Sequence, residues 1–207
     1  MSRGRLITIE GLDGAGKTTL ATGLEAELRA RGIEVRLLRE PGGVQVAERI
    51  RELVKDPDLV IGPRAEALLY AAARAQLVDQ ALEPLLDAGT WVLLDRFVDS
   101  SLAYQGGGRR LGIDAVRDIN QFATGGLTPD RTLLLSIEPA LGRARSQARG
   151  DPLDRLERER EPFHARIAAA YTELAAADPD RIRTIDAGES PERVLAAALR
   201  ALADLVS

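Results

Sequence analysis

Residues 11–18 constrain this chain more than any other segment, because they read Gly-Leu-Asp-Gly-Ala-Gly-Lys-Thr. This order fits the pattern G-x-x-x-x-G-K-[ST], in which glycines allow a tight turn whose backbone N–H groups surround phosphate oxygens. Residues 6–10 form a short β-rich run before the loop, and residues 17–31 carry leucines at helical spacing after it. The segment therefore predicts a P-loop, followed by a helix whose positive end points at the bound anion.

The loop and a later strand supply candidate ligands for a nucleotide and its metal. Lys17 would place a full charge near the β and γ phosphates, and the Thr18 hydroxyl can ligate Mg²⁺. Asp95 ends the apolar run 91–94, where P-loop proteins place a carboxylate near the water shell of the metal. The alternative for Asp95 is a surface residue that simply ends a strand. The eight residues expected to bind ATP are Gly11, Leu12, Asp13, Gly14, Ala15, Gly16, Lys17 and Thr18.

Strands and helices alternate along the rest of the chain. Further strands are expected at 34–38, 91–94, 132–137 and 182–185, and helices at 46–55, 64–87, 114–123, 162–177 and 191–206. Gly106 to Gly108 are expected to break the chain between two of these elements. Such alternation implies βαβ units and a parallel sheet with helices on both faces, with ligands at the carboxyl ends of the strands. We expect an α/β fold in one domain, residues 1–207.

Composition excludes several classes of protein. The chain has 207 residues, 45% hydrophobic and 29% charged, and a formal net charge of −4. This charge argues against bulk electrostatic binding to nucleic acid or to an anionic membrane. The absence of cysteine excludes disulfides, thiolate metal sites and cysteine nucleophiles. No run of 18 apolar residues predicts a membrane span, and the polar start, unlike a signal peptide, favours the cytoplasm.

Two classes of P-loop protein compete, a switch GTPase and a phosphotransferase. The guanine-binding pattern N-K-x-D is absent, because the chain has a single asparagine, Asn120, within Asp-Ile-Asn-Gln. Phosphoryl transfer needs positive charge over the equatorial oxygens, and one stretch supplies it. The arginines of this stretch are Arg143, Arg145, Arg149, Arg155 and Arg158. Their alternative role is a solvated helix face paired with Asp154, Glu157 and Glu159.

Five motifs together resemble one family. EGLDGAGKTT at 10–19, REPGG at 39–43, Asp95-Arg96, AYQGGG at 103–108 and RGDPLDRLE at 149–157 are similar, in order and spacing, to bacterial thymidylate kinases. The resemblance implies transfer of the γ-phosphoryl group of ATP to dTMP with Mg²⁺, giving dTDP and ADP in dTTP biosynthesis. It also implies the nucleoside monophosphate kinase fold, with a five-stranded parallel sheet, a mobile lid at about 142–158 and a homodimer.

The same resemblance implies roles for individual residues. Asp13 matches the acidic residue near the acceptor, and Arg96 the arginine that holds the dTMP phosphate. Arg74 matches the arginine that reads the thymine edge, and Tyr70, on the same helix face, the aromatic residue that stacks on the base. Tyr104 and Gln105 match nucleoside contacts, and Ser101, which stands where some relatives have asparagine or threonine, is also expected to bind dTMP.

The lid is expected to supply the catalytic arginine. Gly14 and Ala15 leave no arginine inside the P-loop, and related members then place the catalytic arginine in the lid. Arg149 is the first candidate, with Arg145 and Arg143 behind it. The expected catalytic residues are therefore Asp13, Lys17, Arg96, Arg145 and Arg149. A deoxynucleoside kinase or another nucleoside monophosphate kinase remains the rival function, and a non-enzymatic switch is more remote.

Overall fold

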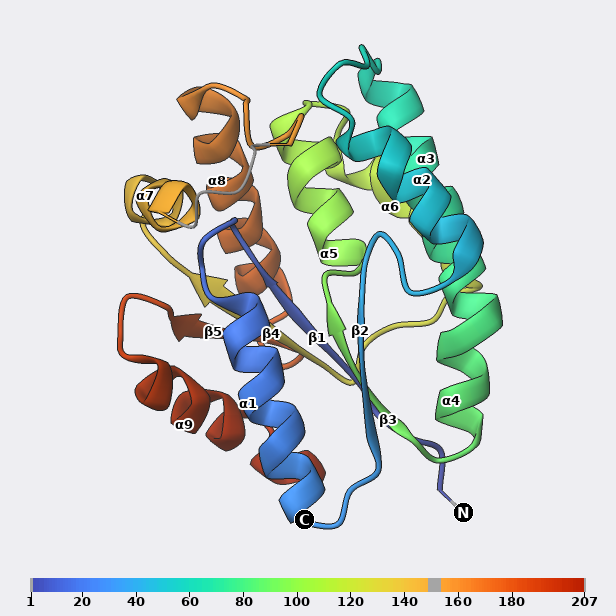
Figure 1. Ribbon diagram of the computed structural model, residues 1–207, viewed down its shortest axis with the longest axis vertical. Coiled ribbons are helices and arrows are strands. Elements are labelled where there is room, and N and C mark those ends of the chain that lie inside the picture. Colours follow the sequence, from blue (N-terminus) through green and yellow to red (C-terminus); the bar gives the residue numbers. More distant parts are fainter. Residues whose placement is uncertain (1, 149–153, 207) are drawn as a thin grey trace.

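One parallel sheet organises the computed structural model, which describes residues 2–148 and 154–206 (Figure 1). Its strand order is β2-β3-β1-β4-β5, and every neighbouring pair is parallel. The strands are β1 (Leu6–Gly11), β2 (Val35–Arg39), β3 (Trp91–Asp95), β4 (Arg131–Ser136) and β5 (Ile182–Asp186). The expected five-stranded parallel sheet is confirmed. Because β1 lies between β3 and β4, the P-loop after β1 leaves the centre of the sheet.

Helices cover both faces of the sheet, as expected (Figure 1). They are α1 (Lys17–Ala30), α2 (Gln45–Lys55), α3 (Pro63–Leu77), α4 (Glu83–Asp87), α5 (Val98–Ser101), α6 (Ile113–Thr124), α7 (Pro139–Ala148), α8 (Glu161–Ala177), α9 (Pro191–Ala201) and α10 (Ala203–Val206), with π-helical segments η1 (Val78–Leu82) and η2 (Leu102–Gly108). Among the described residues, no helix is both long and apolar enough to cross a membrane.

The core lies between the sheet and these helices. β1 is buried along its whole length, as a central parallel strand should be. α1 and α9 pack together on one face, where a Cβ added at Gly23 would lie 3.2 Å from the Leu195 side chain. A separate cluster joins α3, η1 and α4 to β3, with Leu77 and Leu94 fully buried. The two layers hold the strand ends, and therefore the loops that follow them, in fixed positions.

The helix expected at 64–87 contains a π-helical segment. α3 continues through η1 into α4, and Pro84 lies at the start of α4. Proline has no N–H and its ring clashes with the carbonyl four residues earlier. A wider π turn just before Pro84 accommodates the ring without ending the helix.

The break expected at Gly106–Gly108 is wrong. These glycines lie within η2, and the chain turns only after them, where Arg110 has a φ of +58°. A Cβ at Gly107 would lie 2.6 Å from Ala170, and one at Gly108 2.8 Å from the Phe163 ring. The glycines therefore serve the close approach of α8 to η2. The helix expected at 191–206 is also divided, at the buried Leu202.

Candidate active site

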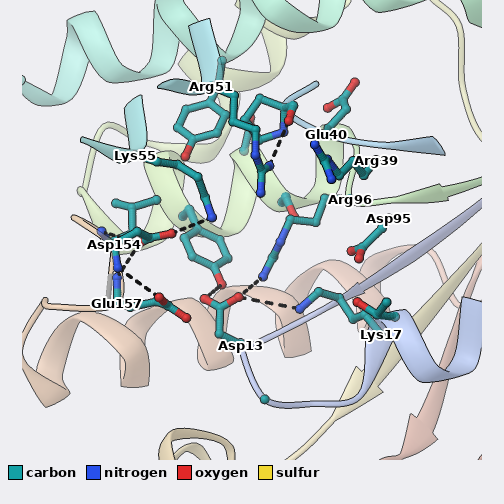
Figure 2. A pocket seen from close by; sticks show the side chains of 18 of the residues that line it. Asp13, Lys17, Arg39, Glu40, Arg51, Lys55, Asp95, Arg96, Asp154 and Glu157 are labelled. Carbon is teal, nitrogen blue, oxygen red and sulfur yellow. Dashed lines mark hydrogen bonds and ion pairs between the residues drawn. The ribbon is translucent and has the colours of Figure 1, made fainter. Parts of the chain in front are cut away.

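A cavity of about 290 Å³ lies at the carboxyl ends of the central strands (Figure 2). Its walls contain ten side chains that the sequence singled out: Asp13, Lys17, Thr18, Tyr70, Arg74, Asp95, Arg96, Ser101, Tyr104 and Gln105. Gly14 and Gly16 of the P-loop also line it, whereas Gly11, Leu12 and Ala15 do not. Residues from four separate segments are thus brought to one site.

The P-loop has the backbone that its glycines predict. Gly11, Gly14 and Gly16 have φ values of +135°, +79° and +91°, in the region that side chains rarely adopt. Gly14 also touches α7, because an added Cβ would lie 2.0 Å from the carbonyl oxygen of Gly142. Glycine is therefore required at position 14 both by its dihedral angle and by the backbone of α7.

Lys17 is almost fully buried and folds back on its own loop. Its ammonium group donates to the carbonyl oxygens of Gly11 at 3.2 Å and Leu12 at 2.9 Å, with Asp13 at 3.8 Å. Burial lowers the pKa of Lys17 to about 8; the charge of Arg96 lowers it further and that of Asp13 opposes this. The positive charge thus depends on nearby carboxylates.

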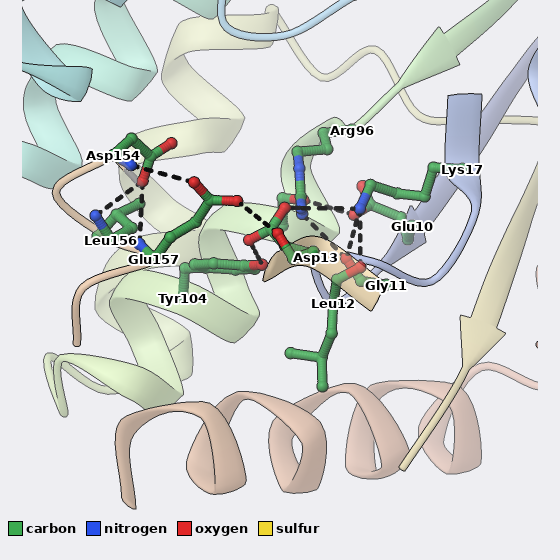
Figure 3. Close-up of polar contacts among 12 residues, drawn as sticks. Glu10, Gly11, Leu12, Asp13, Lys17, Arg96, Tyr104, Asp154, Leu156 and Glu157 are labelled. Carbon is green, nitrogen blue, oxygen red and sulfur yellow. Dashed lines mark hydrogen bonds and ion pairs between the residues drawn. The ribbon is translucent and has the colours of Figure 1, made fainter. Parts of the chain in front are cut away.

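Arg96 joins the end of β3 to the P-loop (Figure 3). Its guanidinium donates to Asp13 Oδ1 at 2.6 Å and to the Gly11 carbonyl and Ser100 Oγ at 3.1 Å each. Its backbone has a φ of +72°, which is uncommon for any residue but glycine and concentrates at functional sites. Three of the five N–H groups of Arg96 face protein acceptors, which leaves donors for an anion.

Asp13 accepts from two groups across the cavity. Arg96 binds one carboxylate oxygen, and the Tyr104 hydroxyl donates to the other at 3.2 Å. Burial alone would raise the pKa of Asp13, but the charges of Arg96 and Lys17 outweigh it and hold that pKa well below its usual range. Asp13 is therefore ionised at neutral pH, between two cations.

Behind Arg96 lies a fully buried carboxylate that the sequence did not single out, Glu10. One oxygen accepts from the Phe97 amide at 2.7 Å, and the other accepts from Ser100 at 2.6 Å and Tyr171 at 2.8 Å. Burial and the nearby Asp99 raise the pKa of Glu10 to about 7. Because Ser100 also accepts from Arg96, Glu10 helps to hold the arginine in place through Ser100.

Arg74 lies at the floor of the cavity with every N–H group in use. Nε and Nη2 contact one oxygen of Glu40 at 2.8 and 2.7 Å, and Nη2 also donates to the Phe97 carbonyl at 2.9 Å. Nη1 donates to Ser101 Oγ at 2.9 Å and to Asn120 Oδ1. A guanidinium has five N–H groups, and these contacts occupy all of them. The protein thus fixes the position and plane of Arg74.

Three cations and three acids of the cavity were missed as individual site residues. Arg39 and Glu40 belong to the motif REPGG, Arg51 and Lys55 to α2, and Asp154 and Glu157 to the motif RGDPLDRLE within the segment expected as the lid. In Figure 2, Lys55 points across the cavity to Asp154. The two motifs gave a signal for four of these residues, whereas Arg51 and Lys55 had none, because α2 reads as an ordinary amphipathic helix.

Asp95 has the open acceptor that a metal site requires. Its Oδ1 atom is buried and has no hydrogen-bond partner among the described residues, and the carboxylate shares the cavity with Thr18. In the described part of the chain, no group of three or more acidic, histidine or cysteine residues could enclose a metal ion. One carboxylate and one hydroxyl suit Mg²⁺, which usually keeps waters and binds substrate phosphates.

The lid arginines divide into three cases. Arg149, the first candidate, lies outside the described residues. Arg145, on α7, donates to the carbonyl oxygen of Ala187 at 2.8 Å, next to the loop between β5 and α9. Arg143 pairs with Glu161 at 3.1 Å, an acidic residue outside the expected partners Asp154, Glu157 and Glu159. Neither Arg143 nor Arg145 lines the cavity.

Comparison with known proteins assigns this chain to a family. The family model described as thymidylate kinase matches residues 9–198. A thymidylate kinase of Deinococcus radiodurans is 51% identical over 187 residues, covering 90% of each chain. One of Halorhodospira halophila is 49% identical over 207 residues, 99% of this chain and 96% of the relative. One of Oenococcus oeni is 49% identical over 205 residues, 97% and 95% of the two chains.

Proposed function

The chain belongs to the thymidylate kinase family and phosphorylates dTMP to dTDP, and we propose that ATP with Mg²⁺ is its phosphoryl donor. The whole chain, residues 1–207, would act as one domain. The observation that carries the proposal is the arrangement of Lys17, Asp13 and Arg96, where a P-loop lysine and an acceptor-side arginine meet at one carboxylate. This arrangement supports a donor phosphate on one side of Asp13 and an acceptor phosphate on the other.

The donor half is built by the P-loop. Backbone N–H groups of residues 11–18 and the start of α1 would bind the phosphates of ATP, and Lys17 would turn from its loop carbonyls to their oxygens. Thr18 and, through water, Asp95 would hold Mg²⁺. When bound, that ion neutralises charge on the β and γ phosphates.

The acceptor half recognises the phosphate of dTMP through Arg96. Its free N–H groups form a planar fork that matches two phosphate oxygens, which lysine cannot do. Asp13 holds this fork in place and lies beside the incoming acceptor, where we propose that it also binds the sugar 3′-hydroxyl. Tyr104 and Gln105 complete the sugar side.

The base would stack on Tyr70 and meet Arg74. Glu66, Tyr70 and Arg74 are spaced four residues apart on α3 and so share one face. Because the Ser101 oxygen accepts from Arg74, its own hydroxyl proton is free to donate to a base carbonyl. Because the protein occupies every N–H group of Arg74, we propose that Arg74 reads the thymine edge through Ser101.

The catalytic arginine is assigned to the lid. Arg149 remains the first candidate, and Arg145 the second, because the P-loop itself contains no arginine. Arg149→Ala should lower kcat more than nucleotide binding, as expected for a group that acts in the transition state. A larger kcat effect of Arg145→Ala would move the assignment to α7.

A homodimer is also proposed. Helices α2, α3 and α6 pack in sequence and expose apolar side chains on the outside of the molecule. These are Val46, Leu53, Leu68 and Phe122, exposed by 46, 47, 57 and 91%. An apolar surface of this kind is typical of an interface. Light scattering should give a mass twice that of one chain, and the Phe122→Asp variant should have the mass of a single chain. A cytoplasmic location fits the substrates, which are intracellular nucleotides.

One assay tests the reaction. The purified protein receives ATP and Mg²⁺ with dTMP, thymidine, dUMP, dCMP or AMP in turn, and ADP formation is followed. We expect dTMP to be the preferred acceptor. Turnover of thymidine without dTMP would contradict the acceptor assignment, and ATP binding without turnover of any acceptor would favour a nucleotide-binding switch.

A further inference from the structure

Another buried carboxylate, Glu66, lies outside the reaction chemistry described above. It occupies the first turn of α3 and is fully buried. Three side chains from two other segments donate to it. Gln105 Nε2 lies 2.9 Å from Oε1, and Oε2 accepts from Arg109 Nη2 at 3.1 Å and Arg155 Nη1 at 2.6 Å. A buried carboxylate of this kind needs strong partners, since an unpaired charge is costly inside a protein.

The partners divide between the cavity and its roof. Gln105 lines the cavity, so one oxygen of Glu66 touches a wall residue. Arg155 belongs to the turn 154–157, whose other members Asp154, Leu156 and Glu157 also line the cavity. Arg109 already has a carboxylate of its own in Glu159. Arg155 therefore provides the charge that balances Glu66.

The turn 154–157, which forms the roof of the cavity, is closed by its own side chains. Asp154 Oδ1 accepts from the amides of Leu156 and Glu157, both at 2.9 Å, while Glu157 Oε2 accepts from the Asp154 amide at 3.0 Å (Figure 3). A turn closed by its own side chains moves as a unit. Anchoring Arg155 therefore anchors the whole roof.

Two further contacts join the same turn to α2. Arg155 Nε donates to the carbonyl oxygen of Val54 at 3.1 Å, and Lys55 pairs with Asp154 at 2.9 Å. Lys55 is 39% exposed in its side chain, so this outer pair is screened by water and contributes little. The Glu66–Arg155 pair, 0 and 11% exposed, is the inner and stronger contact. The Glu66–Arg155 pair reaches α3 and the Lys55–Asp154 pair reaches α2, and both helices lie on the proposed dTMP side of the cavity.

We propose that Glu66 is a positioning residue for the acceptor, because its carboxylate clamps Arg155, and with it the turn 154–157, over the part of the cavity that takes dTMP. The proposal rests on the assignment of that part of the cavity to dTMP. The Glu66–Arg155 contact and dTMP binding stabilise each other. Whatever favours the position of the turn 154–157 over the cavity favours dTMP binding, and dTMP binding favours that position. Glu66 touches no reacting atom, and it acts through Arg155 and Gln105.

The test compares Arg155→Gln with Arg160→Gln, which removes the same charge five residues later at an exposed position. Affinity for dTMP alone and for ATP alone is measured by calorimetry, and KM and kcat by turnover. Arg155→Gln should weaken dTMP binding about tenfold, because the binding-competent fraction falls by that factor. It should leave ATP affinity and the kcat at saturating dTMP within about twofold. Arg160→Gln should change neither affinity.

Glu66→Gln and the double variant complete the experiment. If the two side chains act as one clamp, Glu66→Gln/Arg155→Gln weakens dTMP binding no more than the stronger single variant does. Amide hydrogen exchange at 154–157 should also accelerate in Arg155→Gln while that of α8 is unchanged. If Glu66→Gln does not fold, Arg155→Gln and Lys55→Gln still decide, with the smaller effect expected for Lys55.

Three results would overturn the clamp: unchanged dTMP affinity in Arg155→Gln, an equal loss of ATP affinity, or additive effects in the double variant. The wild-type acceptor assay is read first and separately. If the wild type prefers another acceptor, the substrate assignment fails, and the same variants are measured with that acceptor instead. A failed clamp leaves wild-type turnover of dTMP untouched.

Discussion

Arg96 donates to Asp13 over 2.6 Å, and this contact ties the end of β3 to the phosphate-binding loop after β1. Asp13 in turn lies 3.8 Å from Lys17, so one carboxylate stands between the cation proposed for the acceptor and the cation proposed for the donor. Without Asp13, the neighbouring positive charges of Arg96 and Lys17 would repel each other. Asp13 therefore makes the cationic site stable before any phosphate arrives.

Removing the charge of Asp13 should alter the pH dependence of the reaction. Lys17 has a pKa of about 8, lowered by burial and by Arg96 and supported by Asp13. In the wild type, kcat/KM for ATP should fall as the pH rises through that value, since it reports the free enzyme. In Asp13→Asn the fall should begin at lower pH, and kcat should drop about a hundredfold. An unchanged alkaline limb would contradict the coupling.

Glu10 should make stability depend on pH. Burial and Asp99 raise its pKa in the folded protein from 4.5 to about 7, so the folded state binds this proton more tightly than the unfolded state. The resulting stabilisation is complete below pH 4.5 and is lost as the pH rises through about 7.

Glu10→Gln removes this dependence. The free energy of unfolding of the variant relative to the wild type should therefore increase from pH 5 to pH 8, by at most about 3 kcal/mol. Denaturant titrations at both values measure it. Glu34→Gln, at an exposed position, controls for the loss of one carboxylate. A constant difference between Glu10→Gln and the wild type would show that Glu10 is not the group responsible.

Gly14→Ala should destabilise the protein by more than the backbone strain of a positive φ alone. The residue has a φ of +79° and would press its Cβ to 2.0 Å from the Gly142 carbonyl. Gly32 has nearly the same φ, +78°, with no atom within 4 Å. Gly32→Ala should therefore show only backbone strain, about 1–2 kcal/mol, whereas Gly14→Ala should lose more and weaken ATP binding. Equal losses of stability for Gly14→Ala and Gly32→Ala in thermal unfolding would mean that α7 shifts away from the added Cβ without cost.

The buried pair of Glu40 and Arg74 should be far more sensitive than a surface pair. Glu40→Gln leaves the guanidinium with an uncompensated charge and should destabilise the protein by about 3 kcal/mol, as well as weaken dTMP binding. Glu52→Gln breaks the exposed contact with Arg49 at 3.7 Å and should cost less than about 1 kcal/mol. Chemical denaturation of both variants gives the comparison. Similar small effects would remove the structural role of Glu40.

Local sequence accounts for much of the site. The P-loop is one contiguous segment whose glycines, lysine and threonine form their own geometry, so residues 11–18 could be identified without tertiary information. Tyr70 and Arg74 share a helix face by spacing alone, and the apolar run before Asp95 predicted a strand that ends at the site. The resemblance to thymidylate kinases added Ser101, Tyr104 and Gln105, which no periodicity indicates. The alternation of strands and helices was sufficient for the parallel sheet.

The sequence determined the local elements: which segments are strands, which are helices, and where the phosphate-binding turn lies. The strand order β2-β3-β1-β4-β5 decided the rest, because it sets which loops meet. Only this order brings Arg96 to Asp13, 83 residues away, and places Glu40 under Arg74. It also explains the failed break at Gly106–Gly108, since the need for those glycines comes from α8. Contacts between distant segments depend on the shapes of two surfaces, and no local pattern encodes both.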